Sequence, residues 1–550
     1  MSRLGRWRAP LFAGYVAVTV FSFPHPIPRS MGDGVIDLGF VVAWWSPALL
    51  LLALSGLSPA RAGRAAFAAG LISHALIFHW FYVVTVVYGN APLLAGVLAP
   101  LVPGAYVAAF TGIFGVAWAV LGRLGVASPL SAAALWTGLD HLRSFVLSGF
   151  PWATLGYAQH QNQALMALAP YTGVYGLSFV TVLAGALLAG LVRDGVARRR
   201  PSAGFWAGAA AVLAFHGVGV IDFSSEPEVD LRTVRVAVLQ GNIDQKRKWS
   251  ATRADEILRV YEELTRSAAA DGARIIVWPE SSVPGGIEAL APTPVRLSKL
   301  AREAGAVLVL GAVGLEYDGE SQPVRFTDSA FLVDGAGGLA GRYDKAHLVP
   351  FGEYLPLRDL LGGMITALAR GIATIDVSPG IGPRAVDLTI PGGSDSIRAG
   401  SPICYELIFP DLVRRFVADG AEVLFAITND AWYGRTGAPY QFLAITALRS
   451  AENRVWTARA ANTGISAFID ARGRVRSQTR IFERGWLSAD LPLRPAPIGG
   501  SFYTRYGDVF VWVCWSGVAA LGLRGVARRG RPPRATRSES VGGGRGDVRE

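Results

Sequence analysis

The sequence predicts a polytopic α-helical membrane domain joined to a separate α/β domain. Of the 550 residues, 51% are hydrophobic and only 17% are charged, whereas about a quarter of the residues of a soluble protein are charged. The N-terminal part contains five long stretches without Asp, Glu, Lys or Arg: 9–28, 38–60, 65–122, 144–192 and 202–221. From about residue 225 to 505, apolar and charged residues mix as in an ordinary globular protein.

Eight membrane-spanning helices are expected, because about 20 apolar residues span a bilayer as a helix. The turn-like run 88–92 divides the longest uncharged stretch into two. The predicted spans are 10–26, 36–57, 66–87, 93–121, 127–147, 164–192, 203–222 and 507–524. The chain therefore divides into a seven-span domain (1–224), an outer domain (225–505), a final transmembrane helix (506–524) and a basic, disordered tail (525–550).

The distribution of arginines predicts the orientation of these spans. Eighteen arginines lie in the terminal segments and loops of one side, and only Arg29 and Arg143 lie on the other. Basic residues concentrate on the cytoplasmic side of a membrane protein. Both termini are therefore expected in the cytoplasm, with the outer domain on the extracytoplasmic side.

The net charge of +11 does not indicate nucleic-acid binding. The outer domain contains 32 basic and 32 acidic residues, so the whole excess of positive charge belongs to the membrane loops and the tail. A nucleic-acid-binding domain would instead carry a basic patch of its own. No nucleic-acid partner is expected.

Apolar runs of strand length alternate with helical patterns in the outer domain, as in a layered α/β fold. The predicted strands are 234–243, 273–280, 306–316, 328–337, 396–406, 422–430 and 464–473, and the predicted helices are 250–270, 293–304, 410–418 and 439–461.

The outer domain has one cysteine, Cys404, and one histidine, His347. A zinc site built from Cys and His ligands is therefore excluded, and no P-loop, G-x-S-x-G or H-E-x-x-H motif is present. Polar residues follow three of the predicted strands: Glu280, Cys404 and the pair 429–430. Because ligands of open α/β sheets bind beyond the carboxyl ends of strands, these residues are candidates for one site. Lys345 follows a further strand.

Several motifs resemble those of a known family. They are W-P-E (278–280), Y-D-K-A-H-L-V-P-F-G-E (343–353), I-C-Y-E (403–406) and N-D-A-W-Y-G (429–434). This set resembles the carbon–nitrogen hydrolase (nitrilase) superfamily. The segments 148–159, 240–249 and 459–466 narrow the resemblance to its membrane branch, the apolipoprotein N-acyltransferases, over nearly the whole chain up to about 524.

The resemblance implies an αββα sandwich and a catalytic triad of Glu280, Lys345 and Cys404. Glu280 would be the general base, Lys345 would stabilise the thiolate and the oxyanion, and Cys404 would be the nucleophile. Supporting roles are expected for Glu353, Tyr405 and Glu406, and substrate contacts for Trp249, Asn429 and the apolar loop 358–376.

By the same resemblance, the enzyme transfers a fatty acyl group from a phospholipid, through a cysteine thioester, to the N-terminal amine of a diacylated apolipoprotein. It would lie in the bacterial inner membrane with its catalytic domain in the periplasm. No metal or cofactor is needed, because the donor ester carries the energy.

Two alternatives remain open. The chain could be a membrane-tethered amidase, which would release the acyl group to water. It could also be a transporter or receptor in which the triad is catalytically inactive. Two residues depart from the family pattern, Asp140 and Phe442. Asp140 and Arg143, three residues apart on one helix face, are expected to pair.

Overall fold

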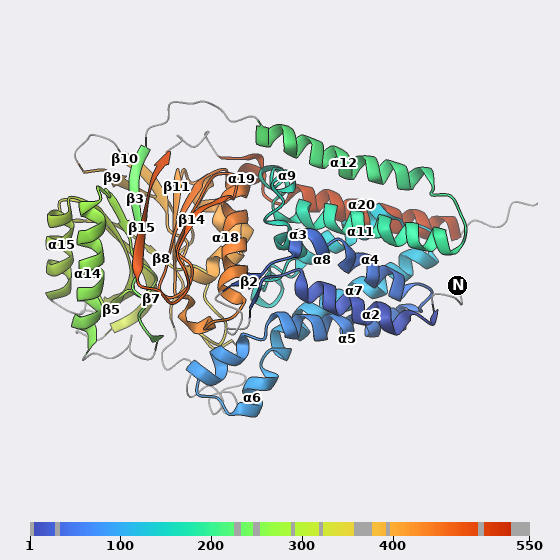
Figure 1. Cartoon of the computed structure of the whole chain (residues 1–550), viewed down its shortest axis with the longest axis horizontal. Coiled ribbons are helices and arrows are strands. Elements are labelled where there is room, and N and C mark those ends of the chain that lie inside the picture. The colour runs from blue at the N-terminus through green and yellow to red at the C-terminus, as the bar shows by residue number, and fades with distance from the viewer. Residues whose placement is uncertain are drawn as a thin grey trace, which may run out of the picture.

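The computed structural model of the chain describes residues 5–27, 34–224, 233–245, 253–287, 292–317, 323–356, 377–391, 396–492 and 500–529. Long helices form one part of the molecule and a β-sandwich with flanking helices forms the other (Figure 1). The last helix returns from the sandwich to lie among the helices of the N-terminal part, beside α11 and α8. The helical part thus combines both ends of the chain.

Apolar sequence forms helices throughout the N-terminal part. The longer ones are α2 (Arg8–Phe21), α4 (Trp45–Leu54), α5 (Pro59–Ile77), α7 (Leu101–Arg123), α8 (Pro129–Leu142), α11 (Val174–Val196), α12 (Ala203–Ser224) and α20 (Val509–Arg529). Shorter turns connect them: α3 (Gly39–Val42), η2 (Val83–Tyr88), α6 (Leu93–Leu98), α9 (Gln163–Met166) and α10 (Ala169–Thr172).

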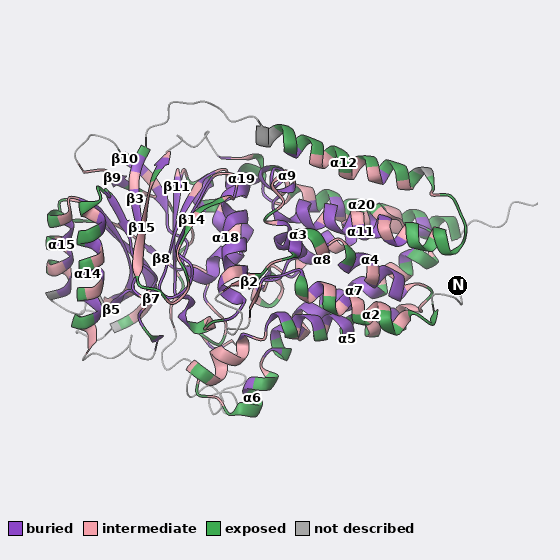
Figure 2. Ribbon diagram, in the orientation of Figure 1, coloured by how far each residue is buried: buried purple, intermediate pink, exposed green. Residues whose placement is uncertain are grey.

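Four segments among the described residues are long and apolar enough to cross a membrane: Leu93–Arg123, Val174–Val196, Gly204–Ile221 and Val509–Arg529. They coincide with four of the eight predicted spans. The other four predicted spans fall on α2, α3 with α4, α5 and α8. Outward faces of these helices carry exposed residues, most plainly along α12 (Figure 2), as expected of helices that meet lipid.

Small residues let neighbouring helices approach closely. A Cβ atom added to Gly115 of α7 would lie 2.7 Å from the carbonyl oxygen of Ala62 in α5, and one added to Gly104 would lie 3.1 Å from the backbone nitrogen of Ala75. Close backbone approach at small residues is the usual way in which helices pack in a membrane.

The outer domain is built on two sheets. One has the order β14-β13-β12-β11-β10-β9, and the other has the order β15-β3-β4-β6-β7-β8, with β5 also paired to β6. The strands are β3 (Thr233–Gln240), β4 (Ile275–Val277), β5 (Val283–Gly286), β6 (Val307–Tyr317), β7 (Pro323–Val333), β8 (Leu339–Asp344), β9 (Val386–Thr389), β10 (Ser396–Gly400), β11 (Val423–Thr428), β12 (Trp456–Ala461), β13 (Ala467–Ile469), β14 (Val475–Gln478) and β15 (Gly485–Pro492).

Helices cover the outer face of each sheet, which gives the expected αββα sandwich. Helices α14 (Ala254–Ala270) and α15 (Pro292–Ala304) cover the sheet of β3, β4 and β6, while α17 (Pro410–Ala418) and α18 (Ala438–Asn453) lie on the other (Figure 1). Alternate residues of β3 show why: Val236 and Val238 face the second sheet, and Ala237 and Leu239 face α14. Helix α18 lies between the sandwich and the membrane helices.

The predicted helix 439–461 was wrong in its last third. Helix α18 ends at Asn453, because Arg454 adopts a left-handed conformation (φ 56°), and residues Trp456–Ala461 form the central strand β12. The strands β5, β8, β9, β14 and β15 were not predicted at all. They are mostly edge strands or short, and a hydrophobic pattern marks such strands weakly.

Candidate active site

Glu280 follows strand β4 and reaches the space between the sheets through a tight backbone contact. It comes three residues after Val277 and is buried. A Cβ atom added to Gly311 of the neighbouring strand β6 would lie 2.4 Å from the carbonyl oxygen of Pro279 and 2.6 Å from Cα of Glu280. Only glycine therefore leaves room for the segment that carries Glu280.

Lys345 follows β8 and its side chain is fully buried. Its Nζ atom donates hydrogen bonds to Glu280 Oε1 (3.2 Å), Asp328 Oδ2 (3.3 Å) and Glu353 Oε1 (2.5 Å). Burial alone would lower the pKa of Lys345, but the carboxylates of Glu353, Glu280 and Asp328 outweigh it and hold that pKa well above its usual value. The lysine is therefore a permanent ammonium in this site.

Cys404 occupies a strained turn between β10 and the 3-10 helix η6 (Cys404–Ile408). Its φ of +46° is a conformation that non-glycine residues adopt only when the surrounding structure enforces it, and such strain clusters at functional sites. The backbone of Asn429 lies beside its sulfur and lowers the pKa of the thiol. Burial and the nearby Glu280 raise the pKa of the Cys404 thiol, and Lys345 opposes that rise. In the resting site, Cys404 is a neutral thiol.

Glu406 ties the cysteine turn to the lysine segment. Its Oε2 accepts a hydrogen bond from the backbone N–H of Ile403 (2.8 Å). Its Oε1 accepts from the N–H groups of Ala346 (2.7 Å) and His347 (3.2 Å) and from the hydroxyl of Tyr343 (2.7 Å). Burial raises its pKa to about 7. Glu406 thus holds backbone on both sides of the site and does not bond to the Lys345 ammonium.

Glu353 and Tyr405 also lie where they support the site. The second oxygen of Glu353 accepts the N–H of Val349 (2.9 Å), which fixes the carboxylate against Lys345. The Tyr405 hydroxyl donates to the carbonyl oxygen of Gly149 (3.3 Å), in the membrane part. The His347 ring packs on Phe409, with ring centroids 3.9 Å apart, so the only histidine of the outer domain serves packing.

Asn429 contributes its backbone to the site, while its side chain is bonded elsewhere. The side chain donates to Gln245 Oε1 (2.8 Å) and accepts from Asn462 (3.1 Å). The next residue, Asp430, forms a buried ion pair with Arg459 (2.9 Å). Trp249 and the loop 358–376, both expected to contact substrate, lie outside the described residues.

Asp328 also belongs to the site, although it was not among the predicted site residues. It lies in β7, opposite Val313 of β6, and its backbone carbonyl accepts the N–H of Lys345 (2.8 Å). Its only signal in the sequence is an acidic residue directly ahead of an apolar run. Its approach to Lys345 depends on the pairing of β7 with β8, and β8 was itself not predicted.

Aromatic residues of the membrane part meet the loop after β11. Trp80 and Trp152 lie against Tyr433, with ring centroids 4.9 and 5.9 Å apart. Phe442 stacks on Trp152 at 5.3 Å, and the Arg459 guanidinium lies 4.9 Å from the Phe442 ring. Phe442, one of the two residues that depart from the family pattern, therefore joins the membrane part to the Asp430–Arg459 pair.

Asp140 and Arg143 form the expected pair. Arg143 donates to Asp140 Oδ1 (3.1 Å) and to the carbonyl oxygens of Phe150 (3.3 Å) and Trp152 (2.7 Å). Ser178 of α11 donates to the other carboxylate oxygen (2.9 Å). The pair braces the loop that carries Trp152, and its role here is structural.

Comparisons with known proteins agree with this architecture. The family model for carbon–nitrogen hydrolase matches residues 235–495, and the model for the apolipoprotein N-acyltransferase N-terminal domain matches 17–187. An apolipoprotein N-acyltransferase of Geobacter metallireducens is 40% identical over 92% of this chain and 93% of its own. Those of Allorhizobium ampelinum and Vibrio parahaemolyticus are 35% and 30% identical, over 73% and 93% of this chain and 74% and 96% of their own. The solved structure of an amidase from Nesterenkonia sp. is 20% identical, covering 49% of this chain and 94% of that one with a TM-score of 0.36.

An αββα sandwich set against a bundle of apolar helices, and matched by the carbon–nitrogen hydrolase model, defines a membrane enzyme of the carbon–nitrogen hydrolase class. The relatives narrow this class, and the chain belongs to the apolipoprotein N-acyltransferase family. It is an acyltransferase that N-acylates lipoproteins, with a lipid donor and a lipoprotein acceptor, and a multi-pass protein of the bacterial inner membrane. The hydrolytic and the transporter alternatives are set aside.

Proposed function

We propose that Cys404 carries the acyl group as a thioester between a phospholipid donor and the amine of a diacylated apolipoprotein. The observation that supports this most directly is the place of Cys404, at a strained turn (φ +46°) beside the charges of Glu280 and Lys345. A thiol is a weak nucleophile unless a base takes its proton. Glu280 is the base in this proposal.

In the first step the Cys404 proton passes to Glu280 while sulfur attacks the ester carbonyl of the phospholipid. The S–C bond forms, the carbonyl oxygen becomes an oxyanion, and the C–O bond to the glycerol backbone breaks. Glu280 returns the proton to the departing alkoxide, so a lysophospholipid leaves and an uncharged thioester remains. No redox partner is required.

Lys345 stabilises negative charge in this step. At rest its three N–H donors all face carboxyl oxygen atoms. When Glu280 accepts the thiol proton it becomes a weaker acceptor, so one N–H of Lys345 can turn toward the oxyanion. Removing such a donor costs about 3–4 kcal/mol of transition-state stabilisation. The N–H of Tyr405, at the start of η6, is the second donor in this proposal, because first-turn N–H groups have no partner within their own helix.

In the second step the free amine of the apolipoprotein's N-terminal diacylglyceryl cysteine attacks the thioester. An amide forms, the S–C bond breaks, and a proton from the amine restores the Cys404 thiol. Trp249 and Asn429 are proposed substrate contacts. Both substrates are anchored in lipid, which fits a site joined through aromatic residues to membrane helices.

We further propose that the catalytic domain faces the periplasm and that both termini are cytoplasmic. The arginine asymmetry of the loops supports this orientation. Two reporters fused separately to the C-terminus test this orientation. One is active only in the periplasm, and the other is fluorescent only in the cytoplasm. Periplasmic activity at the C-terminus would overturn the orientation.

The covalent mechanism is tested by intact-mass analysis of detergent-purified enzyme incubated with phospholipid. We expect an acyl adduct on the wild type that hydroxylamine removes and that a diacylated lipopeptide with a free amine discharges. Cys404→Ala should form no adduct, whereas the matched control Cys514→Ala should form it normally. An adduct on Cys404→Ala, or no adduct on the wild type, would overturn the thioester.

A further inference from the structure

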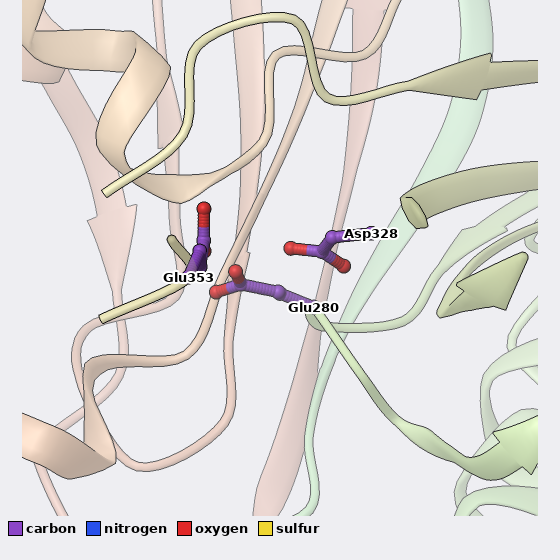
Figure 3. A group of neighbouring side chains, drawn as sticks. All are labelled: Glu280, Asp328 and Glu353. Atoms are coloured by element: carbon purple, nitrogen blue, oxygen red, sulfur yellow. The ribbon is translucent and has the colours of Figure 1, made fainter. Parts of the chain in front are cut away.

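Three buried carboxyl groups surround the Lys345 ammonium. Oxygen atoms of Glu280, Asp328 and Glu353 lie within 4.8 Å of one another (Figure 3). All three also contact Nζ of Lys345, at 3.2, 3.3 and 2.5 Å. A metal ion would have to displace this ammonium, so the lysine is the cation of the cluster.

The charges of this cluster do not balance if every carboxyl group is ionised. Three carboxylates and one ammonium leave an excess of two negative charges in a buried site. Like charges this close prevent simultaneous ionisation, as in other paired carboxylates. At least one of the three therefore holds a proton.

The surroundings of the three groups differ. Glu353 makes the shortest contact with the ammonium and also accepts the Val349 N–H, so both of its oxygens are stabilised as an anion. Asp328 has one oxygen, Oδ1, that is buried with no hydrogen-bond partner among the described residues. An ionised carboxylate with a bare buried oxygen is costly.

Asp328 also lies close to Glu280. Oxygen atoms of the two side chains lie within 4.8 Å of each other, and both side chains contact Nζ of Lys345. Two neighbouring carboxyl groups can share a hydrogen bond only when one of them carries a proton. Burial, reinforced by Glu280, raises the pKa of Asp328 well above its usual value, against the effect of Lys345. The charge count requires a proton on one of the three groups, and the unpartnered Oδ1 atom singles out Asp328.

We propose that Asp328 is a protonated positioning residue that donates a hydrogen bond to Glu280 and keeps Glu280 the ionised base beside Cys404. This proposal rests on the assignment of Glu280 and Cys404 above. It explains how Asp328 stabilises the Glu280 anion while leaving Glu280 free to accept a proton. Asp328 acts on the reaction through Glu280 and Lys345 and does not touch the substrate.

The test compares Asp328→Ala with Asp328→Asn in the full-length enzyme. Alanine removes the donor, so the Glu280 anion is less stable and takes up a proton at higher pH. We expect acylation by phospholipid to fall about 10- to 100-fold, as for loss of a buried hydrogen bond to a charged group, and the acidic limb of its pH profile to move to higher pH. Asparagine keeps a neutral donor, so it should recover the rate to within a few-fold and leave the acidic limb in place.

If Asp328 is instead ionised, Asp328→Asn removes a negative charge beside Glu280 and the acidic limb moves to lower pH. That result would overturn the proposal. Glu316→Gln, which neutralises a half-exposed carboxylate paired with Arg325 elsewhere on the β6–β7 pair, is the matched control and should change neither rate nor profile.

Infrared difference spectra between the wild type and Asp328→Asn test whether Asp328 carries a proton, and they do not depend on enzyme activity. The wild type should show a protonated-carboxyl band that the variant lacks, and its absence from the difference would overturn the proposal. If the wild type forms no Cys404 adduct but the band is present, the proposed thioester fails while the protonated Asp328 stands.

Discussion

The Tyr343 hydroxyl donates a 2.7 Å hydrogen bond to Glu406 Oε1, which joins strand β8, just ahead of Lys345, to the turn that carries Cys404. The same carboxylate accepts the backbone N–H groups of Ile403 and Ala346. The segments that carry Lys345 and Cys404 therefore both take their position from one buried side chain.

Glu406→Gln should lower acylation about 10- to 100-fold and destabilise the fold by about 1–3 kcal/mol. The amide has one acceptor oxygen, so its NH2 group must face at least one N–H donor that the carboxylate satisfied. Thermal unfolding and adduct formation measure both effects. Tyr343→Phe, which removes one donor of four, should cost less in each. Equal activity of Glu406→Gln and wild type would show that the link does not position the site.

The stability of the protein should fall as pH rises from 4.5 to 7. Burial raises the pKa of Glu452 from 4.5 to about 7, as it does for Glu406. Between these values the unfolded chain has lost the proton that the folded protein keeps, so rising pH favours unfolding. Glu452→Gln removes one such group. The melting temperature of the wild type minus that of this variant should fall as pH rises from 4.5 to 7. A constant difference from pH 5 to 8 would contradict the raised pKa of Glu452.

Gly311→Ala should abolish most activity while leaving the sandwich folded. The added methyl group would lie 2.6 Å from Cα of Glu280, so the segment that carries the base must shift. A displacement of about 1 Å at a catalytic group costs on the order of 100-fold in rate. Gly485→Ala in β15 is the control, because its Cβ would meet no atom within 4 Å. Wild-type activity in Gly311→Ala would mean that the close approach is not needed for catalysis.

Arg143→Leu should destabilise the protein by about 3–5 kcal/mol, because it leaves Asp140 buried without its partner and frees the carbonyl groups of Phe150 and Trp152. The double variant with Asp140→Leu should recover part of that loss. Melting temperatures of the two single variants and the double variant measure the coupling. Additive losses would indicate that the pair does not act as a unit.

Hydrophobic patterns predicted the helices of the membrane part and most central strands, because both depend on continuous apolar runs. They failed at residues 454–461, where a helix was predicted but Arg454 adopts a left-handed conformation and the chain enters β12. They also missed β8 and β9, whose partly exposed residues give little contrast between faces.

Glu280, Lys345 and Cys404 were predicted as one site, since each follows an apolar strand and the motifs around them resemble one family. The structure places all three around a single buried cluster. The way in which Glu406 supports the site was not predicted: it accepts hydrogen bonds from the backbone N–H groups of Ala346 and Ile403. Backbone contacts of this kind leave no trace in residue type.

By itself, the sequence determined the two-part architecture and the residues proposed to carry the chemistry, because burial of apolar residues and reactive side chains are properties of composition and local order. Only the tertiary structure decided how charge is shared within the site. Asp328 meets Lys345 through the β7–β8 pairing, and Gly311 admits Glu280 through the adjacent strand. Such contacts join residues far apart in the chain, and their energies depend on distance and burial, which a linear pattern does not contain.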